Sequence, residues 1–197
     1  MSERTARIAR TTKETDIELS IDLDGTGTTD IETGIGFFDH MLTAFGRHGL
    51  FDLSVRVDGD LEVDGHHTVE DVGIVAGQAF ASALGDKRGI RRFGSIALPM
   101  DEALILAAVD ISGRGQLFWE ADVPAVMVGA FDATLAKEFF IAFAANAGVT
   151  LHIRELAGEN THHVIEGMFK AVARAMRQAV EADPRMGDAL PTTKGAL

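Results

Sequence analysis

Three landmarks of this 197-residue chain occur twice and in the same order. The pairs are residues 66–70 (HHTVE) with 162–166 (HHVIE), residues 21–27 (IDLDGTG) with 109–115 (VDISGRG), and residues 37–38 with 139–140 (both FF). Because three matches in one order are hard to attribute to chance, we interpret the chain as two copies of one unit. We place the halves at residues 1–88 and 89–197, joined at the segment DKRGIRR, and expect them to form one compact domain.

Hydrophobic periodicity predicts strands and helices in both halves. Apolar and polar residues alternate over residues 15–23, which predicts a strand, and a second strand is expected at 50–57. Helical spacing of apolar residues predicts a short helix at 37–45, a longer one at 66–84 and another at about 162–182. Each half is therefore strand-rich with two helices, which favours an α+β fold. We expect two outer sheets to enclose the helices of both halves.

The composition excludes several classes of protein. A net charge of −12 argues against sequence-independent binding of nucleic acid, which requires Lys and Arg to neutralise phosphates. Charged residues interrupt every apolar stretch, so we expect no membrane span, and the polar N-terminus lacks the apolar core of a secretion signal. The absence of cysteine excludes disulfides and thiolate metal sites, and it fits residence in the cytoplasm. A basic cluster of Lys87, Arg88, Arg91 and Arg92 can still attract a small anion.

The repeated HHxxE motif has the spacing of a metal site. In each copy the first histidine and the glutamate are four residues apart, so both side chains share one helical face and can reach one ion. The second histidine points about a quarter-turn away and can serve a different metal. The candidate ligands are His66, His67, Glu70, His162, His163 and Glu166. Imidazole and carboxylate without thiolate suit manganese, iron or zinc. A polar cap or a packing accident would explain one such pair, but two matching motifs favour metal binding.

Two further histidines can complete the metal sites. His40 follows Asp39, which can orient its ring, and His152 lies in a predicted strand just before the second motif. These residues and the motifs together supply three histidines and one glutamate for each of two metals. One metal can draw its ligands from both halves or from neighbouring subunits, in which case metal binding drives assembly. For His40 or His152 taken alone, an ordinary half-buried histidine is the alternative.

Short segments along almost the whole chain resemble one enzyme family. They are residues 12–15 (TKET), 37–42 (FFDHML), 65–71 (GHHTVED), 85–90 (GDKRGI), 92–94 (RFG), 99–103 (PMDEA), 112–114 (SGR), the second HHxxE motif and 191–195 (PTTKG). In this order they are similar to imidazoleglycerol-phosphate dehydratase. Two segments depart from the family pattern: PTTKG carries threonine where serine is common, and residues 42–45 (LTAF) lack the glutamine of many members.

The resemblance implies a fold, a reaction and an assembly. The fold is α+β, with duplicated half-domains whose helices are sandwiched between two four-stranded mixed sheets, of the ribosomal protein S5 domain 2-like type. The reaction is dehydration of D-erythro-imidazole-glycerol phosphate to imidazole-acetol phosphate, a step of L-histidine biosynthesis. Members assemble with Mn2+ into a 24-subunit homo-oligomer with active sites at subunit interfaces, and we expect two Mn2+ ions per active site. No phosphatase segment precedes or follows the domain, so we expect the monofunctional form.

The chemistry of this reaction explains the need for metals. The hydrogen to be removed lies on an alcohol carbon and is not acidic, whereas the departing hydroxyl lies on the carbon attached to the imidazole ring. Metals on both ring nitrogens would hold the ring as an electron-rich imidazolate, which can expel this hydroxyl to give a diazafulvene. The resemblance assigns acid–base catalysis to Glu14, and we count Glu70 and Glu166 as catalytic too. Glu102 falls opposite Glu14 in the repeat, so one of the two can serve chemistry and the other structure.

The resemblance also implies a phosphate site. Its expected residues are Arg92, Arg114, Lys170, Thr192 and Lys194, whose cationic and hydroxyl groups suit phosphate. Arg91 is the nearest rival of Arg92. We expect the polar C-terminal end of the second half to act as a phosphate-binding tail that is mobile until phosphate binds.

Two other functions account for part of the sequence. A dinuclear metal hydrolase would use a metal-bound water as its nucleophile, and only the candidate ligands point to it. A non-catalytic metal-assembled shell would explain the acidic charge and the histidines, but it leaves the clustered arginines and the TKG tail unexplained. The expected partners are therefore a small phosphorylated imidazole and further copies of the chain, with no nucleic acid and no membrane.

Overall fold

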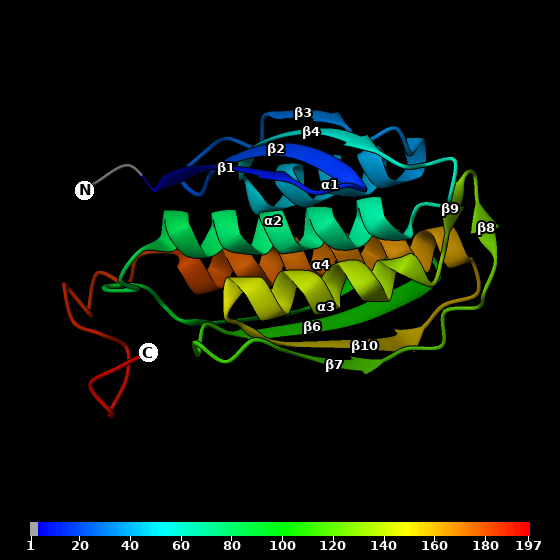
Figure 1. Ribbon diagram of the computed structural model, residues 1–197. Helices are drawn as coiled ribbons and strands as arrows, with labels where there is room; N and C mark the ends of the chain where they lie inside the picture. Colours follow the sequence, from blue (N-terminus) through cyan, green and yellow to red (C-terminus); the bar gives the residue numbers. More distant parts are fainter. Residues whose placement is uncertain (1–3) are drawn as a thin grey trace.

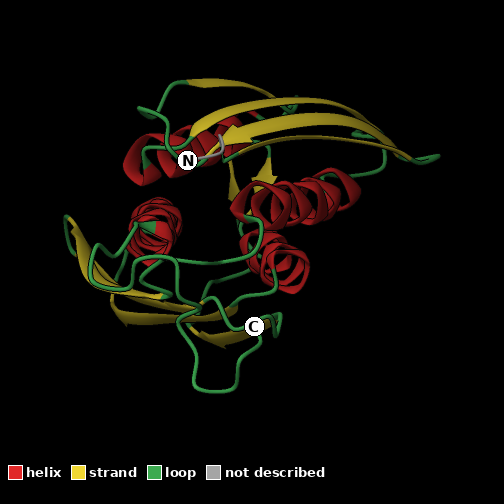
Figure 2. Ribbon diagram, turned by 90° about the vertical axis from the view of Figure 1, so that its left-hand side faces the viewer, coloured by secondary structure: helices red, strands yellow, loops and turns green. Residues whose placement is uncertain are grey.

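Four helices lie between two four-stranded sheets in residues 4–197, the part of the chain that the computed structural model describes (Figure 1). Figure 2 shows the same layers from the side, with the helices enclosed between the sheets. One sheet comes from the first half of the chain and the other from the second half. The predicted α+β sandwich with its duplicated half-domains is therefore confirmed.

The first sheet has the strand order β1-β2-β4-β3. Its strands are β1 (Thr5–Thr11), β2 (Thr15–Asp22), β3 (Thr29–Glu32) and β4 (Asp52–Gly59). β2 pairs antiparallel with both β1 and β4, whereas β3 pairs parallel with β4, so the sheet is mixed. Alternation along β2 buries Ile17, Leu19 and Ile21 against the helices and leaves Glu18 on the outer face.

The second sheet repeats this arrangement with the order β5-β6-β10-β7. Its strands are β5 (Phe93–Met100), β6 (Ala103–Asp110), β7 (Gln116–Glu120) and β10 (Thr150–Ala157). β6 pairs antiparallel with β5 and β10, and β10 pairs parallel with β7. The registers correspond as well, because Thr5 faces Asp22 in the first sheet and Phe93 faces Asp110 in the second. A small hairpin of β8 (Met127–Val128) and β9 (Phe131–Asp132) is an addition of the second half.

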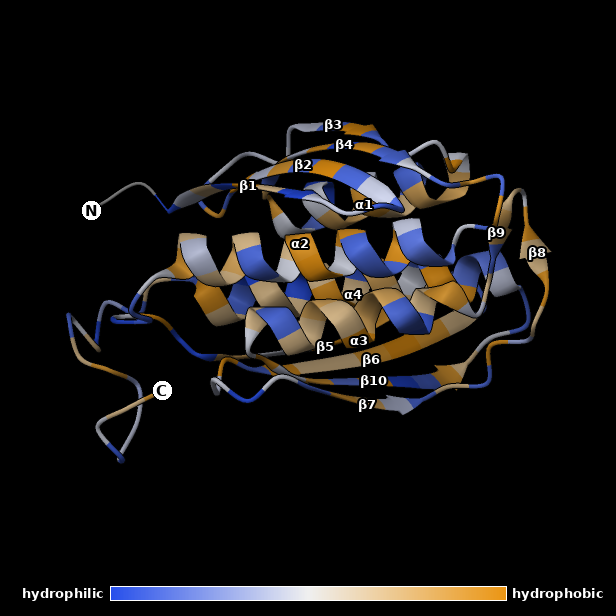
Figure 3. Ribbon diagram, in the orientation of Figure 1, coloured by the Kyte–Doolittle hydropathy of each residue, from blue (hydrophilic) through white to orange (hydrophobic). Residues whose placement is uncertain are grey.

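The helices are α1 (Gly36–Gly49), α2 (His66–Leu84), α3 (Leu135–Ala147) and α4 (Thr161–Val180). α1 packs against α4 and α2 against α3, so each pair joins one helix from each half. Fully buried phenylalanines fill the space between them: Phe38, Phe80, Phe139, Phe140, Phe143 and Phe169. Burial of each such side chain contributes about 1.5–3 kcal/mol. Figure 3 shows the hydrophobic residues concentrated in this central layer and on β6. The two halves therefore share one core.

Several element boundaries differ from the predicted ones, most of all at the end of the first helix. The first helix was expected to end at residue 45 but continues to Gly49, where Leu50 adopts a left-handed conformation with φ 55° and ends it. The following strand consequently begins at Asp52 rather than at residue 50. α4 ends at Val180, two residues before the predicted end. The boundaries of α2 agree with the prediction, and Gly85 ends that helix with a φ of 65°.

The segment after α4 runs to the end of the chain without a helix, and a single bridge between Ile90 and Ala182 is its one β-type pairing among the described residues. It lies at the opposite end of the sandwich from the β8–β9 hairpin (Figure 1). Within residues 4–197, no helix is both long enough and apolar enough to cross a membrane.

Two glycines let α2 and α3 approach closely. A Cβ added at Gly73 would lie 2.7 Å from the Phe139 carbonyl oxygen, and one at Gly77 would lie 2.7 Å from the Phe143 carbonyl oxygen. These distances leave no room for a side chain, because real Cβ atoms essentially never come within 3.0 Å of such atoms. The helix pair that joins the two halves therefore depends on glycine at these positions.

We expect Gly77→Val to destabilise the protein by about 1–3 kcal/mol, because the added methyl groups must push α2 and α3 apart. Urea unfolding monitored by circular dichroism measures this change. Ser82→Val is the matched control, since Ser82 is exposed on the same helix, and it should change the free energy of unfolding by less than about 0.5 kcal/mol. Equal losses in the two variants would contradict the packing argument.

Candidate active site

Both histidine pairs lie in the first turn of a helix at the same end of the sandwich (Figure 1). Asp64 and Asn160 each accept the N–H of the first histidine of a motif, and Asn160 is also the N-cap residue of α4. The His66 N–H donates to Asp64 Oδ1 at 2.7 Å, and the His162 N–H donates to Asn160 Oδ1 at 2.9 Å. Such caps satisfy backbone donors that have no partner within the helix. The polar residue two positions before each motif therefore holds the backbone at the first histidine in both halves.

The structure brings three of the predicted ligands together. His40 of α1 and His162 and Glu166 of α4 offer ligand atoms that all lie within 4.8 Å of one another. His40 Nε2 is 3.4 Å and His162 Nε2 is 3.1 Å from Glu166 Oε2. The packing of α1 on α4 makes this cluster, so the first half supplies one member and the second half the other two. Two imidazoles and a carboxylate that leave further positions open form a donor set suited to a divalent transition metal.

Glu166 is the buried member of this cluster and is paired with Lys170. Lys170 Nζ lies 2.6 Å from Glu166 Oε1, one helical turn away on α4. Burial by itself raises the pKa of Glu166, but Lys170 outweighs burial with help from His40 and His162, so the pKa lies below its ordinary value. The carboxylate is therefore held in the charged form that a cation requires. Lys170 lies at this end of the molecule, not beside the other predicted phosphate residues.

The first motif forms a separate, more open group. His66 Nε2 is 3.9 Å from Glu70 Oε2, which agrees with the predicted common face, and both side chains are nearly half exposed. Among the described residues, the cluster of His40, His162 and Glu166 is the one group with metal-ligand spacing, so a single chain does not bring His66 and Glu70 to it. The two motifs thus present two groups at one end of the sandwich, as the separate metals predicted from the sequence would require.

The second histidine of each pair is held by a carboxylate through its Nδ1 atom. His67 Nδ1 lies 3.0 Å from Asp60 Oδ2, and His163 Nδ1 lies 2.8 Å from Glu102 Oε2. The hydrogen bond that His67 donates to Asp60 raises the pKa of His67, and the one that His163 donates to Glu102 raises the pKa of His163. Conversely, the hydrogen bond from His163 lowers the pKa of Glu102 to about 2. This arrangement fixes the ring tautomer and leaves Nε2 available as a ligand.

Asp60 was not found from the sequence. It comes from the β4–α2 loop, whereas Glu102 comes from the β5–β6 turn, so comparison of the repeats does not connect them. Glu102 also accepts the Asn160 N–H at 2.9 Å, which occupies it fully in holding the start of α4. One of Glu14 and Glu102 was expected to serve chemistry and the other structure, and the structural contacts belong to Glu102.

Glu14 lies in the turn between β1 and β2, beside the first motif. Its Oε1 is 3.9 Å from His67 Nε2, and its side chain is about half exposed. The backbone is held on both sides, since the Glu14 N–H donates to Thr12 Oγ1 and the Asp60 N–H donates to the Glu14 carbonyl, each at 3.0 Å. A free carboxylate on a fixed backbone next to a candidate ligand has the position that an acid–base group needs.

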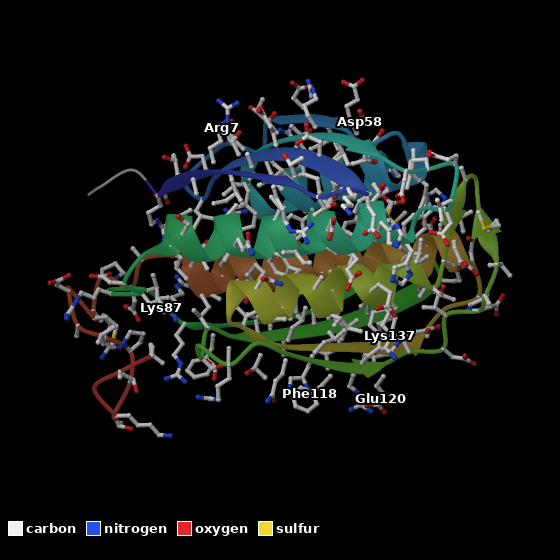
Figure 4. All side chains as sticks on the ribbon, in the orientation of Figure 1. Arg7, Asp58, Lys87, Phe118, Glu120 and Lys137 are labelled. Atoms are coloured by element: carbon white, nitrogen blue, oxygen red, sulfur yellow. The ribbon has the colours of Figure 1, made fainter. Side chains whose placement is uncertain are left out.

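His152 lies apart from the other candidate ligands of its own chain, and the expected role of Asp39 beside His40 differs from the structure. His152 lies on the outer face of the second sheet, stacked on Phe118 with ring centroids 4.4 Å apart, so it faces away from the helices and the other ligands. Figure 4 shows Phe118 projecting outward from this sheet. Alternation in β10 explains this, because Leu151 and Ile153 take the inner positions. Asp39 accepts hydrogen bonds from Thr33 and so orients the loop before α1 rather than the His40 ring.

Apart from Lys170, the predicted phosphate residues lie towards the other end of α4. Arg92 forms a two-point ion pair with Asp110 and donates to the Pro191 carbonyl at 2.8 Å, so it fastens the tail to the second sheet. Arg114 is exposed, and its contact with Asp110 is loose, because 3.9 Å separates Arg114 Nη2 from Asp110 Oδ2. In the tail, Lys194 donates its N–H to Thr192 Oγ1. Arg114 is therefore the arginine of this corner that is most available to an anion.

Known proteins match the chain over nearly its full length. A family model described as imidazoleglycerol-phosphate dehydratase matches residues 33–176. The imidazoleglycerol-phosphate dehydratase of Acidiphilium cryptum (strain JF-5) is 63% identical over 194 residues, which cover 98% of this chain and 99% of that protein. The enzyme of that name from Roseobacter denitrificans is 60% identical over 98% of this chain and 100% of that protein.

Solved structures agree with the sequence matches. Imidazoleglycerol-phosphate dehydratase from Staphylococcus aureus subsp. aureus N315 has a TM-score of 0.83 and 41% identity, covering 91% of this chain and 99% of that one. The structure of IGPD from Pyrococcus furiosus in complex with (S)-C348 has a TM-score of 0.82 and 38% identity, covering 96% of this chain and 100% of that one.

We expect Glu102→Gln to lower the pKa of His163 from its raised value towards the ordinary 6.5. The raised pKa of His163 stabilises the fold fully below pH 6.5, and this contribution is lost as pH rises through that pKa. The lowered pKa of Glu102 stabilises the fold above pH 4.5, and this is lost as pH falls to about 2. The variant should therefore lose most stability between pH 4.5 and 6.5.

An NMR pH titration of the metal-free protein measures the ring pKa, and urea unfolding over the same range measures the stability. Asp60→Asn serves as the matched control, because it should shift His67 and leave His163 unchanged. An unaltered His163 midpoint in Glu102→Gln would show that the hydrogen bond does not hold the ring.

Proposed function

The chain belongs to the imidazoleglycerol-phosphate dehydratase family of hydro-lyases, and from that premise we propose that it is a metal-dependent dehydratase of histidine biosynthesis. The proposed reaction converts D-erythro-imidazole-glycerol phosphate to imidazole-acetol phosphate and water. The observation that carries the metal dependence is the cluster of His40, His162 and Glu166, in which a buried, charged carboxylate meets two imidazoles.

The donor atoms fit a divalent metal, and we propose Mn2+ in two sites. His40, His162 and Glu166 would contribute to one site. The remaining ligands would be His66 and Glu70 of the first motif, together with the Nε2 atoms of His67 and His163, whose Nδ1 atoms are bound by carboxylates. His152 stays in the proposed set as a ligand for a site shared with a neighbouring subunit, because its ring lies on the outer face of the second sheet. When bound, the metals would act as Lewis acids that make the imidazole ring electron-rich and favour departure of the neighbouring hydroxyl.

The chain's own residues would then move the protons. Loss of the hydroxyl gives a diazafulvene, in which the hydrogen on the adjacent carbon is acidic enough for a carboxylate to remove. Glu14 is the proposed acid–base residue, because its carboxylate is free and lies 3.9 Å from His67 Nε2. Glu70 and Glu166 remain proposed as ligands and as members of the catalytic site, where Glu166 is kept ionised by Lys170.

Arg92 and Arg114 lie at the end of the molecule away from the histidines, in a region that we call the arginine corner, and its position supports a site shared between subunits. α4 contains 20 residues and is therefore about 30 Å long. His162 is near its start, whereas the Arg92 N–H donates to the carbonyl of Ala179 near its end. A small phosphorylated imidazole cannot span this distance. We propose that the arginine corner of one subunit faces the histidine end of another, and that the assembly is the 24-mer expected from the resemblance.

The outer faces of the sheets favour assembly as well. The first sheet presents charged side chains such as Arg7, Glu18 and Arg56 on its outer face. Beside an exposed ion pair of Arg154 with Glu120, the second sheet presents more apolar residues at the corresponding positions: Phe93, Ala97, Pro99, Leu104, Leu106, Ala108, Phe118 and Leu156. An apolar sheet face is typical of a surface that a neighbouring subunit covers. We further propose that the protein works in the cytoplasm, with neither nucleic acid nor membrane as partner, as its acidic, cysteine-free sequence indicates.

Removal of metal should abolish dehydration, and restored Mn2+ should return it. The assay measures imidazole-acetol phosphate formed by the chelator-treated full-length protein before and after Mn2+ is added, with particle size followed by light scattering. Because the ligands are proposed to come from several subunits, the particles should shrink on metal removal. If the fully metallated, assembled protein forms no product, a hydrolase or a non-catalytic shell becomes the better interpretation, and phosphate release from phosphoesters distinguishes these two.

Arg114→Ala should raise KM by roughly 10-fold or more, because a charge-assisted contact to phosphate contributes about 1.5–3 kcal/mol. Arg91→Ala is the matched control, since Arg91 is also an exposed arginine but pairs with Glu181. Steady-state kinetics of both variants provide the comparison. A KM that rises equally in both, or in neither, would remove Arg114 from the proposed phosphate site.

A further inference from the structure

Asp71 is a buried carboxylate that the proposed chemistry does not use. It follows Glu70 on α2, but one residue further round the helix its side chain points to the first sheet instead of the histidines. Asp71 Oδ2 accepts a hydrogen bond from Thr15 Oγ1 at 2.5 Å. The same oxygen lies 2.5 Å from Arg10 Nη1, as an ion pair without hydrogen-bond alignment. Asp71 and Thr15 are both buried.

Asp71 contacts one residue in each of the two strands that flank Glu14. Arg10 is near the end of β1, and Thr15, the residue after Glu14, begins β2. The turn is closed locally, because Thr12 Oγ1 accepts the N–H groups of Glu14 and Thr15, each at 3.0 Å. Asp71 therefore joins this turn to α2, the helix that carries His67. This joint acts beside a second link, in which Asp60 donates its N–H to the Glu14 carbonyl and binds the His67 ring through its carboxylate.

The second half of the chain shows that the fold does not require this polar group. Comparison of the strand registers makes Leu98 the equivalent of Arg10 in the second half and Ala103 the equivalent of Thr15. The motif alignment makes Gly167 the equivalent of Asp71. All three positions are apolar or small there, and a Cβ at Gly167 would already lie 2.9 Å from Ile105 Cγ1. At this position helix α4 thus packs directly on its sheet, with no counterpart of the Asp71 carboxylate between them.

The functional difference between the halves follows the same division. In the second half, Glu102 is the counterpart of Glu14, and its carboxylate is bound to His163 and to the backbone of Asn160. Within residues 4–197 the Glu14 carboxylate makes no hydrogen bond, and its ion-pair contact is the one to His67 Nε2 at 3.9 Å, so the backbone carries most of its positioning. A buried ion pair seldom adds net stability over apolar packing. The Asp71–Arg10 pair occurs only in the half that contains Glu14, which indicates a role for this pair other than stabilising the fold.

We propose that Asp71 is a positioning residue that, through Thr15 and Arg10, fixes the turn carrying Glu14 relative to His67. This inference rests on the proposed function, in which Glu14 is the acid–base residue. Misplacement of a reacting group by about 1 Å can lower a rate by up to about 100-fold. The contribution of Asp71 is therefore expected in kcat, not in the binding of substrate or metal.

The test exchanges the polar group for the set found in the second half. The variant Arg10→Leu, Thr15→Ala, Asp71→Gly copies a combination that already packs in this fold, and Asp71→Asn is a milder change that keeps an acceptor for Thr15. The control is Arg7→Ala with Glu18→Ala, which breaks an exposed ion pair between the same two strands. All are studied as full-length, Mn2+-loaded proteins, with kcat, KM, bound Mn2+ and amide hydrogen exchange at Glu14 and Thr15 measured.

We expect kcat to fall by roughly 10- to 100-fold in the triple variant and by less in Asp71→Asn. KM and bound Mn2+ should stay within 2-fold or so of the parent protein, and exchange at Glu14 and Thr15 should become faster; the control should match the parent in all four measurements. A triple variant with the parent's kcat or unchanged exchange would overturn the proposal, and Asp71→Asn decides in the same way if the triple variant does not fold. An inactive parent protein would overturn the proposed function, whereas faster exchange in the variants would still support the joint.

Discussion

Each sheet of this protein is amphipathic along its strands and buries one face against the two helices of its own half, and those helices have a second apolar face that the helices of the other half cover. The helices of both halves therefore share one core, in which α1 of the first half packs on α4 of the second and α2 packs on α3. This shared burial is the constraint on which the active site depends. It brings His40 of one half to His162 and Glu166 of the other, and it places the starts of α2 and α4 at one end of the sandwich. Hydrophobic packing thus positions polar groups that are far apart in the chain.

Much of this architecture could be predicted from the sequence. The repeated motif indicated the duplication, and the period of the apolar residues indicated the helix at 66–84 and the strand at 15–23, because both elements have one buried face. The spacing of the HHxxE motifs correctly predicted that His162 and Glu166 share a helical face. Such features are local, since they depend on residues within a few positions of one another in one helix or strand.

The contacts that the sequence did not reveal are those between distant elements. Asp60 and Glu102 hold equivalent histidines from different loops, so neither periodicity nor the repeat points to both. His152 has the residue type of a ligand, but the alternation of β10 turns it to the outer face. The length of α1 depends on the left-handed conformation of Leu50, which leucine seldom adopts. In each case the deciding factor is tertiary geometry, which composition and spacing do not carry.

The contrast between the two outer faces implies that the halves respond oppositely to ionic strength. Exposed ion pairs such as Arg7–Glu18 and Arg56–Asp30 connect neighbouring strands of the first sheet, and added salt screens such pairs. Apolar contacts on the second sheet gain strength in salts that are excluded from protein surfaces, such as sulfate. Salt would therefore loosen the outer surface of one half while it strengthens contacts at the surface of the other. The two halves thus share one fold, but salt affects the contacts on their outer surfaces differently.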